Sequence, residues 1–254
     1  MRVTVLGSGT SSGVPRVGGD WGDCDPTNRR NRRRRVSVLV EHGPATLLVD
    51  TSPDLREQLL DAGVGKLTAV FYTHDHADHA HGIDDLRAVA HNMGRRVDCF
   101  ANPATWEALK ARFGYIFDGS AGYAAFGAAH ELKDEHRFGA LVVRPFRQIH
   151  GMMDSVGYRF EADGRAAAYS TDLNAIPLES EPLLEGLDLW VVDALRRRPH
   201  PTHPHLALTL EWIARFRPRR AIITHMDTSM DYDSLRAELP QGVEPGYDGL
   251  TVEL

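Results

Sequence analysis

The stretch FYTHDHADHAHG, residues 71–82, constrains the fold of this chain more than any other segment, because it places four histidines within eight positions. Each imidazole carries two ring nitrogens that need partners once they are buried. A hydrophobic core cannot easily supply partners for so many rings. The stretch is therefore either a solvated loop or a set of ligands for a bound species.

The histidines begin where an apolar run ends. Residues 67–73 (LTAVFYT) are almost continuously apolar, which predicts a strand buried on both faces. His74 and His76 are two positions apart, so an extended backbone points both to one side. Asp78 and His79 lie past the turn and can face a neighbouring position. Two imidazoles in one group, and a carboxylate with an imidazole in the other, suit two adjacent divalent cations.

Polar residues at three other strand ends supply the further ligands that such a centre needs. His150 ends RPFRQIH, Asp172 follows AAAYST, and His225 ends AIITH. Each of them follows an apolar strand and precedes a turn, and a strand end holds a ligand rigidly. This recurrence favours a metal centre over a solvated loop.

The order of the expected elements predicts an α/β (α+β) chain with two β-sheets between outer helical layers, rather than one doubly wound sheet. The expected strands cover residues 2–6, 36–41, 45–50, 67–73, 97–101, 140–149, 155–161, 165–170, 187–194, 221–225 and 251–254. The expected helices are one with Ser52 as N-cap and Pro53 as its first residue, and those over 82–93, 103–113 and 206–216. Residues 114–139 show no clean period, which is typical of a lid or binding loop. No linker divides the chain, so we expect one domain over residues 1–254.

Composition limits the partners and the compartment. The net charge of −6 argues against a stable complex with nucleic acid. No apolar run approaches the roughly 20 residues of a membrane span. Cys24 and Cys99 are the only cysteines, so no disulfide framework is expected and we predict a cytoplasmic protein. The exposed strands and apolar loops that we expect are compatible with a homodimer.

The pattern HxHxDH, followed by a histidine, an aspartate and a histidine at strand ends, resembles the metallo-β-lactamase-fold hydrolase superfamily. The strings LGSGTSSGVP, NRRRRVSVLV, HGIDDLR, YSTDL and RPHPTHPHLALTLEWI resemble its branch that contains the phosphodiesterase of the carbon–phosphorus lyase pathway. The resemblance covers most of the chain and implies a four-layer αβ/βα sandwich. One departure is that the N-terminal loop has a single cysteine, Cys24, where that phosphodiesterase has a cysteine cluster that binds a separate zinc. We therefore expect no third zinc.

Carried over position by position, the resemblance implies two divalent cations, Zn²⁺ or Mn²⁺, held about 3.5–4 Å apart. The first cation is assigned to His74, His76 and His150. The second is assigned to Asp78, His79 and His225, and Asp172 is assigned as the bridge between the two. A hydroxide that bridges the cations would attack the substrate, and Asp78 would contribute to catalysis as well as to cation binding.

The same branch implies a small cyclic or nucleotide-like phosphodiester as the substrate. His203, in the string PTHPHL, is expected to contact the phosphate or to protonate the leaving oxygen. His200 and His205 lie in the same loop and remain candidates for this role.

Two N-terminal features are candidates for further substrate contacts. The run RRNRRRR, residues 29–35, is either a solvated surface or an anion-binding rim, because guanidinium groups match phosphate oxygens. In the second interpretation Arg34 and Arg35 line the approach of the phosphate. The glycine-rich loop over residues 7–13, with Ser11, either offers backbone N–H groups to an anion or forms a tight exit from the first strand.

Two other functions remain open. One is an RNA 3′-end processing nuclease of the same fold, an activity that usually comes with a protruding RNA-clamping arm. No long basic insertion is present outside residues 29–35. The other is a nucleotide- or metal-binding protein without turnover, which the complete set of ligands disfavours. The sequence favours a hydrolase that acts on a small phosphodiester.

Overall fold

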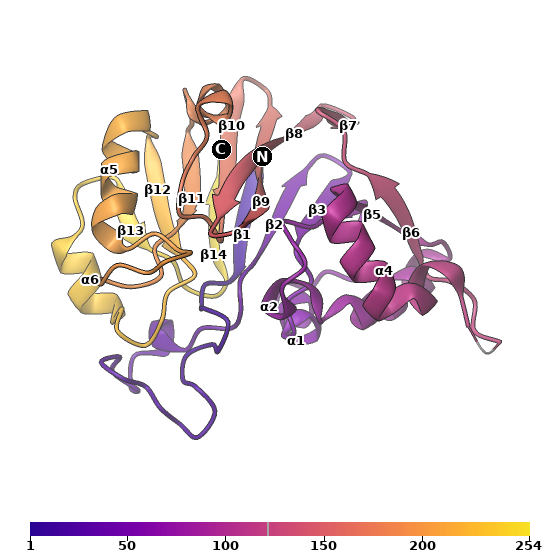
Figure 1. Ribbon diagram of the computed structural model, residues 1–254, viewed down its shortest axis with the longest axis horizontal. Helices are drawn as coiled ribbons and strands as arrows, with labels where there is room; N and C mark the ends of the chain where they lie inside the picture. Colours follow the sequence, from indigo (N-terminus) through magenta and orange to yellow (C-terminus); the bar gives the residue numbers. More distant parts are fainter. Residues whose placement is uncertain (121) are drawn as a thin grey trace.

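The computed structural model describes residues 1–120 and 122–254, and its two β-sheets face each other between outer helices (Figure 1). In spatial order the first sheet contains β14 (Leu250–Glu253), β1 (Arg2–Gly7), β2 (Ser37–His42), β3 (Ala45–Val49), β4 (Ala69–Phe71), β5 (Val97–Ala101) and β6 (Gly127–Glu131). The second contains β13 (Val243–Pro245), β12 (Arg220–Thr224), β11 (Leu189–Asp193), β10 (Arg165–Ser170), β9 (Met153–Ala162), β8 (Leu141–His150) and β7 (His136–Phe138). The helices are α1 (Leu55–Asp61), α2 (Ala77–Ala80), α3 (Leu86–Met93), α4 (Pro103–Asp118), α5 (Leu206–Phe216) and α6 (Tyr232–Glu238), with short 3₁₀ segments at Arg29–Asn31, Ile83–Asp85 and Leu178–Leu184.

The central strands are apolar throughout because their side chains alternate between two cores. Val38 and Val40 of β2 belong to the core between the sheets, whereas Leu39 belongs to the core under α1, α3 and α4. In β4, Phe71 likewise belongs to the core between the sheets and Val70 to the core under the helices. Successive side chains of a strand point to opposite faces, so a strand covered on both faces needs an unbroken apolar sequence. The strand expected before the histidine stretch is of this kind.

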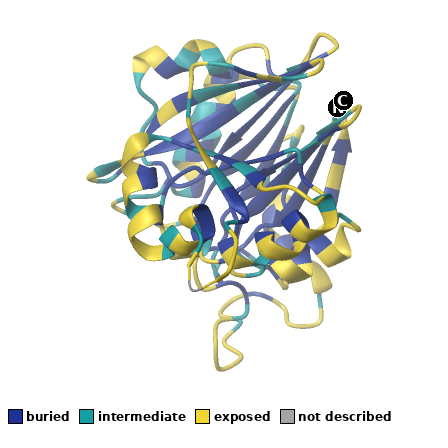
Figure 2. Ribbon diagram, turned by 90° about the vertical axis from the view of Figure 1, so that its right-hand side faces the viewer, coloured by how far each residue is buried: buried dark blue, intermediate teal, exposed yellow. Residues whose placement is uncertain are grey.

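A third core completes the layers. Trp190 of β11, Ile213 of α5 and Leu235 of α6 are buried together on the far side of the second sheet. The molecule is therefore a four-layer αβ/βα sandwich, which confirms the expected fold. Figure 2 shows the buried strands inside and the exposed outer faces of the helices. Among the described residues, none of the helices is both long and apolar enough to cross a membrane.

The first helix starts later than the sequence predicts. Asp54 is the N-cap and α1 begins at Leu55, so the expectation of Ser52 as N-cap and Pro53 as the first helical residue is wrong. The Ser52 hydroxyl accepts a hydrogen bond from the Asp54 N–H and donates one to Gln58, which holds the chain in a turn before the helix.

Residues 114–139 are more ordered than an irregular lid. Helix α4 continues to Asp118, β6 pairs in parallel with β5, and β7 pairs with β8. The β5–β6 pairing joins strands that are distant in sequence, so a local period cannot reveal it. The helix expected over residues 82–93 is divided into a 3₁₀ turn, Ile83–Asp85, and α3, and α2 precedes it. Helix α6 and strand β13 were not expected at all.

The strand directions bring the predicted ligands to one edge of the sandwich. β3 and β4 are parallel, as are β10, β11 and β12, so the carboxyl ends of each set lie together. β8 is antiparallel to β9, which is antiparallel to β10, so β8 ends at the same edge as β10. The two sheets meet there, because the Val156 N–H donates to the Thr73 carbonyl at 2.9 Å.

Candidate metal centre

The structure brings all seven predicted ligands together at this edge. His74 follows β4, and its ring centroid lies 4.5 Å from that of His76 and 4.3 Å from that of His79. The ring of His150, at the end of β8, lies 5.3 Å from that of His74. The ring of His225, which follows β12, stacks on that of His79 at 5.8 Å.

The side chains form two groups that share Asp172. His74, His76, His150 and Asp172 each offer one ligand atom within 4.8 Å of the others, and so do Asp78, His79 and His225. Asp172 Oδ2 lies 3.6 Å from His74 Nε2 and 3.5 Å from His150 Nε2. Its Oδ1 lies 3.0 Å from His79 Nε2 and 3.3 Å from His225 Nε2. One carboxylate thus turns one oxygen to each group.

The donor atoms fit divalent cations. His74 Nε2 and His79 Nε2 are buried and find no hydrogen-bond partner among the described residues. The other ring nitrogen is occupied in both cases, because His74 Nδ1 meets Thr73 Oγ1 at 3.0 Å and His79 Nδ1 meets Asp50 at 2.8 Å. A buried nitrogen without a partner costs free energy unless something binds it. Imidazole nitrogens and carboxylate oxygens are the ligands that Zn²⁺ and Mn²⁺ take in proteins.

Asp50, which ends β3, orients both groups. Its carboxylate accepts hydrogen bonds from the Thr73 N–H at 2.8 Å and the Thr73 hydroxyl at 2.7 Å, besides that from His79 Nδ1. Since the hydroxyl proton of Thr73 goes to Asp50, the Thr73 oxygen must accept from His74 Nδ1. Both rings therefore carry their proton on Nδ1 and turn Nε2 inward, as metal-ligating histidines do.

The site carries an excess of negative charge. Burial lowers the pKa of His225, but the carboxylates of Asp172 and Asp193 outweigh burial and raise it to about 9. Burial also opposes protonation of His79, and Asp172, Asp78 and Asp50 raise its pKa well above the usual value. Without cations, protons take up the missing positive charge. This electrostatic balance is a second reason why the site fits cations.

The ligand-bearing turns are strained in a common way. Asp50, Asp172 and His225 have φ values of 65°, 52° and 59°, although none of them is glycine. The left-handed region costs a non-glycine residue about 1–3 kcal/mol, and such residues cluster at functional sites. Asp50 and His225 directly follow β3 and β12, and Asp172 comes two residues after β10, so similar turns direct three polar side chains to the edge of the sheets.

His203 is the histidine of the 200–205 loop that reaches the centre. Its ring stacks on that of His225 at 4.8 Å with an interplanar angle of 10°, and its Nε2 lies 3.7 Å from Asp172 Oδ2. Its Nδ1 lies 3.0 Å from Asp193 Oδ2. The ring of His200 lies 5.1 Å from that of His203, and His205 is the N-cap residue of α5. The geometry therefore favours His203 among the three candidates.

Sequence reasoning missed Asp50 and Asp193. Asp50 ends ATLLVD and Asp193 ends LWVVD, so both satisfy the rule that found the other ligands, a polar residue directly after an apolar strand. The sequence does not reveal which histidines they contact.

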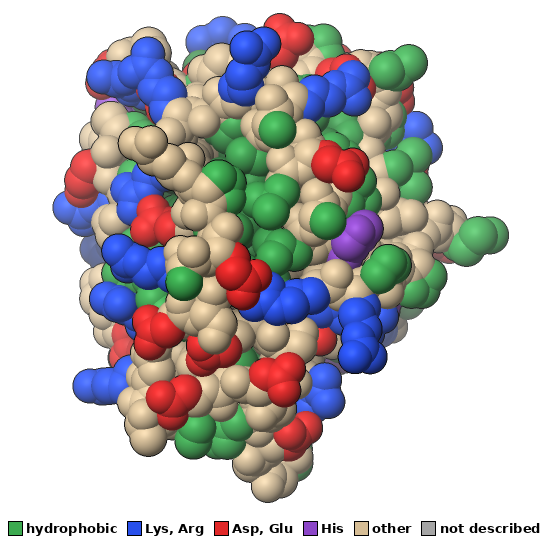
Figure 3. Space-filling model, turned by 90° about the vertical axis from the view of Figure 1, so that its left-hand side faces the viewer, with side chains coloured by type: hydrophobic (Ala, Val, Ile, Leu, Met, Phe, Trp, Pro, Cys, Tyr) green, Lys and Arg blue, Asp and Glu red, His purple; other side chains and the backbone are tan. Residues whose placement is uncertain are grey.

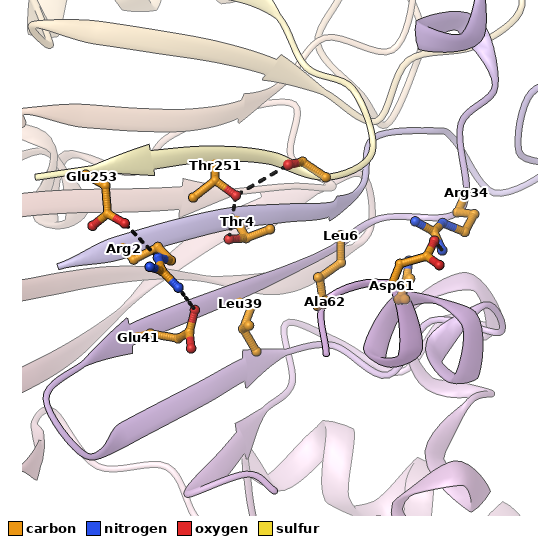
Figure 4. Close-up of a pocket in the computed structure, with 12 residues that line it drawn as sticks. Arg2, Thr4, Leu6, Arg34, Leu39, Glu41, Asp61, Ala62, Thr251 and Glu253 are labelled. Carbon is orange, nitrogen blue, oxygen red and sulfur yellow. Dashed lines mark hydrogen bonds and ion pairs between the residues drawn. The ribbon is translucent and has the colours of Figure 1, made fainter. Parts of the chain in front are cut away.

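Two arginines of the run, Arg34 and Arg35, are paired with carboxylates. Arg34 is paired with Asp61 at 2.8 Å and with Asp248 at 3.1 Å, and it lines a cavity of about 320 Å³ on the outer face of β1, β2 and β14 (Figure 4). Arg35 is paired with Asp54 at 2.8 Å. These ion pairs favour a structural role for both arginines, and their expected part in lining the approach of phosphate stays a prediction.

Ser11 lies on the histidine side of the molecule. It is exposed in the loop after β1. The neighbouring Thr10 N–H donates to the carbonyl of Met226 at 3.1 Å, and Met226 directly follows His225. The glycine-rich loop therefore borders the candidate centre.

A comparison with known families now identifies the chain. The sequence model of the β-lactamase superfamily domain matches residues 45–226, a range that contains every predicted metal ligand. The chain belongs to the β-lactamase superfamily. The family match, the likeness to a solved diphosphatase and the histidine and aspartate clusters together show a metal-dependent hydrolase.

Two solved structures resemble this β-lactamase-superfamily hydrolase over its full length. A diphosphatase from the PhnP family is 37% identical with a TM-score of 0.91, and the match covers 100% of this chain and 97% of that chain. The Zn²⁺-bound PqqB of Methylobacterium extorquens is 21% identical with a TM-score of 0.77, and the match covers 100% of both chains. The first supports the PhnP-like branch, and the second supports the fold.

A curated relative is longer than this chain. The octanoyltransferase of Porphyromonas gingivalis is 32% identical over 98% of this chain, but the match covers 51% of the octanoyltransferase. The chain thus spans about half the length of that relative, whose name describes the longer protein.

Proposed function

We propose that this hydrolase is a phosphodiesterase that uses two divalent cations, Zn²⁺ or Mn²⁺, to cleave a small cyclic or nucleotide-like phosphodiester. The observation that carries the proposal is the position of Asp172, which turns one oxygen to each of two imidazole groups. His74, His76 and His150 are the proposed ligands of the first cation. Asp78, His79 and His225 are those of the second, with Asp172 between the two.

The cations supply one part of the chemistry and the chain supplies the rest. When bound, two divalent cations activate water as a nucleophile and neutralise the negative charge that develops on the phosphate. His203 is proposed to donate a proton from Nε2 to the leaving oxygen, a step that contributes about 10²–10⁴-fold. Asp193 accepts from His203 Nδ1 and so keeps Nε2 directed at the centre. Ser11 is proposed to contact a phosphate oxygen at the border of the site.

A second substrate class has its own support. The 37% identical structure is described as a diphosphatase. In a diphosphate that joins two organic groups, each phosphorus carries one ester bond and one anhydride bond. Attack of water at one phosphorus would break the anhydride bond, and the other phosphate would leave and take a proton from the same donor. We therefore propose diphosphates as the alternative to phosphodiesters.

The other two functions fit less well. An RNA-processing nuclease needs a positive surface for the RNA backbone, but the net charge is −6 and two arginines of the basic run are neutralised by carboxylates. A binding protein without turnover does not need His203 and Asp193 beside a complete set of ligands.

Hydrolysis of bis-p-nitrophenyl phosphate tests the proposal. The purified protein with added Mn²⁺ or Zn²⁺ should release nitrophenol, and Asp172→Ala should not. Parallel assays with a cyclic nucleotide and a dinucleoside diphosphate separate the two substrate classes. No turnover of any of these substrates by the cation-loaded wild type would favour the binding protein.

Three further expectations stay predictions: the single domain, the cytoplasmic location and the homodimer. Figure 3 shows apolar side chains gathered in the middle of one face and bordered by charged side chains, on the side of the molecule where α5 and α6 lie. Sedimentation of the purified protein measures its oligomeric state directly.

A further inference from the structure

His76 differs from the other histidines of the first cation group. It is exposed, and among the described residues no hydrogen bond reaches its ring. His74 Nδ1, by contrast, meets Thr73, and His150 Nδ1 meets the carbonyl of Thr202 at 2.8 Å. A metal-ligating histidine usually has such a partner on its second nitrogen, and the partner fixes the ring. Apart from edge contacts with the rings of His74 and His150, the orientation of His76 therefore depends on its backbone.

Arg112 holds the backbone that leads into His76. From α4, its Nη2 donates to the backbone carbonyl of Asp75 at 2.7 Å and also contacts the Asp75 carboxylate. Its Nε donates to the carbonyl of Ala108 at 3.2 Å, which anchors the guanidinium on its own helix. Nη1 lies 3.4 Å from His81 Nε2. One side chain thus ties the helix to Asp75 within the HxHxDH motif and to His81 just after it.

The contact with the carbonyl matters because of the geometry of the peptide. The carbonyl of Asp75 belongs to the planar peptide group that joins Asp75 to His76. Holding that oxygen fixes the plane from which the His76 side chain projects. The Asp75 carboxylate adds a charge-assisted hydrogen bond to the same guanidinium. The pair is partly shielded, since the side chains of Arg112 and Asp75 are 34% and 27% exposed.

We propose that Arg112 is a positioning residue that acts through Asp75 to hold His76 in place for the first cation. The inference rests on the proposed two-cation centre. It gives α4 a part in positioning a metal ligand, although no residue of α4 belongs to the HxHxDH motif. Loss of the contact should weaken cation binding by the first group, which includes His76. Cation binding by the second group should stay unchanged, because His79 is anchored separately by Asp50.

Cation binding to the metal-free protein tests the proposal. Competition with a chromogenic chelator gives the number of Zn²⁺ or Co²⁺ ions bound and the affinity of each. Wild type should bind two, and Arg112→Gln should bind one of them about 10–100-fold more weakly, as is typical when the partner of a ligating histidine is lost. Arg112→Lys should recover part of the loss, because an ammonium can reach one of the two oxygens but lacks the planar fork. The Co²⁺ absorption spectrum should change in Arg112→Gln for the weaker ion alone.

Arg87→Gln is the matched control. Arg87 is also a partly exposed arginine paired with an aspartate, Asp84, at 3.1 Å, but it does not touch the ligands. The Arg87→Gln variant should bind both cations as wild type does, and the metal-free forms of all variants should unfold at similar temperatures. Equal affinities for both cations in Arg112→Gln and wild type would overturn the inference. Equal weakening of both cations, or the same weakening in Arg87→Gln, would overturn it as well. A wild type that binds no cation would refute the proposed function itself, and the inference with it.

Discussion

Replacement of Asp50 with asparagine tests how one buried carboxylate controls both cation groups. Asp50 Oδ2 accepts from the Thr73 hydroxyl and from His79 Nδ1, while Oδ1 accepts from the Thr73 N–H. Asparagine has the same shape but only one acceptor oxygen. If that oxygen stays on the Thr73 N–H, the amide NH₂ faces the hydroxyl and His79 Nδ1. The His79 proton must then move to Nε2, which is the proposed ligand atom.

The expected loss follows from these contacts. A hydrogen bond to a charged group contributes about 1.5–3 kcal/mol, and a donor left without an acceptor costs about 1–3 kcal/mol. Loss of such a partner typically weakens metal binding about 10–100-fold, and each tenfold change corresponds to about 1.4 kcal/mol. The two estimates overlap, so Asp50→Asn should lower the affinity for the cation held by His79 at least about tenfold. The affinity for the cation near His74 should fall less, because Thr73 lies between His74 and Asp50.

Chelator competition with the metal-free variant measures both affinities. Asp98→Asn is a suitable control, because it also removes an aspartate paired with a histidine, His130, at 2.8 Å, but on the surface. Wild-type affinity for both cations in Asp50→Asn would refute the reasoning that Asp50 sets the ring nitrogens.

Three other predictions follow from the same contacts. His203→Ala should lower kcat about 10²–10⁴-fold while cation content stays at the wild-type level, because a proton donor and not a ligand is lost; loss of cation in metal analysis would make His203 a ligand instead. Chelation should abolish turnover and lower the thermal midpoint, because cations bind the folded state, and added Mn²⁺ or Zn²⁺ should restore both; activity that survives chelation would contradict the cation requirement. Burial opposes the ionisation of Asp231, but hydrogen bonds from the N–H groups of Ser234 and Asp25 lower its pKa to about 2. Its stabilising effect should be complete above an unfolded pKa of about 3.9 and should vanish as the pH falls toward 2. The difference in unfolding free energy between wild type and Asp231→Asn should therefore shrink with acid, and a difference independent of pH would contradict this.

The parts of the fold that the sequence predicts are those with a strong local signal. The strand at Arg165–Ser170 and the helix at Leu206–Phe216 match the expected ranges, because an apolar run or period marks each of them. β6, with the sequence GAAHE, has no such signal, and its order comes from parallel pairing with β5. Its formation depends on residues about 30 positions away, which local reasoning does not include.

The candidate site also has a part that the sequence predicts and a part that it does not. The proposed ligands were predictable because His74, His150, Asp172 and His225 are polar residues at the ends of apolar strands, and because the order of all seven resembles a known motif. The role of the arginine run was not, since charge in a sequence does not reveal its partner. Arg34 meets Asp248, which lies 214 positions away, and that pairing favours a structural role, while the expected substrate contact stays a prediction.

The number and place of bound cations test the central claim most directly. Metal analysis of the reconstituted protein, together with anomalous diffraction from its crystals, should find two cations per chain, one on each side of Asp172. Asp172→Ala should lose this pair. A wild-type protein that binds no transition metal after reconstitution, or binds it away from Asp172, would contradict the account.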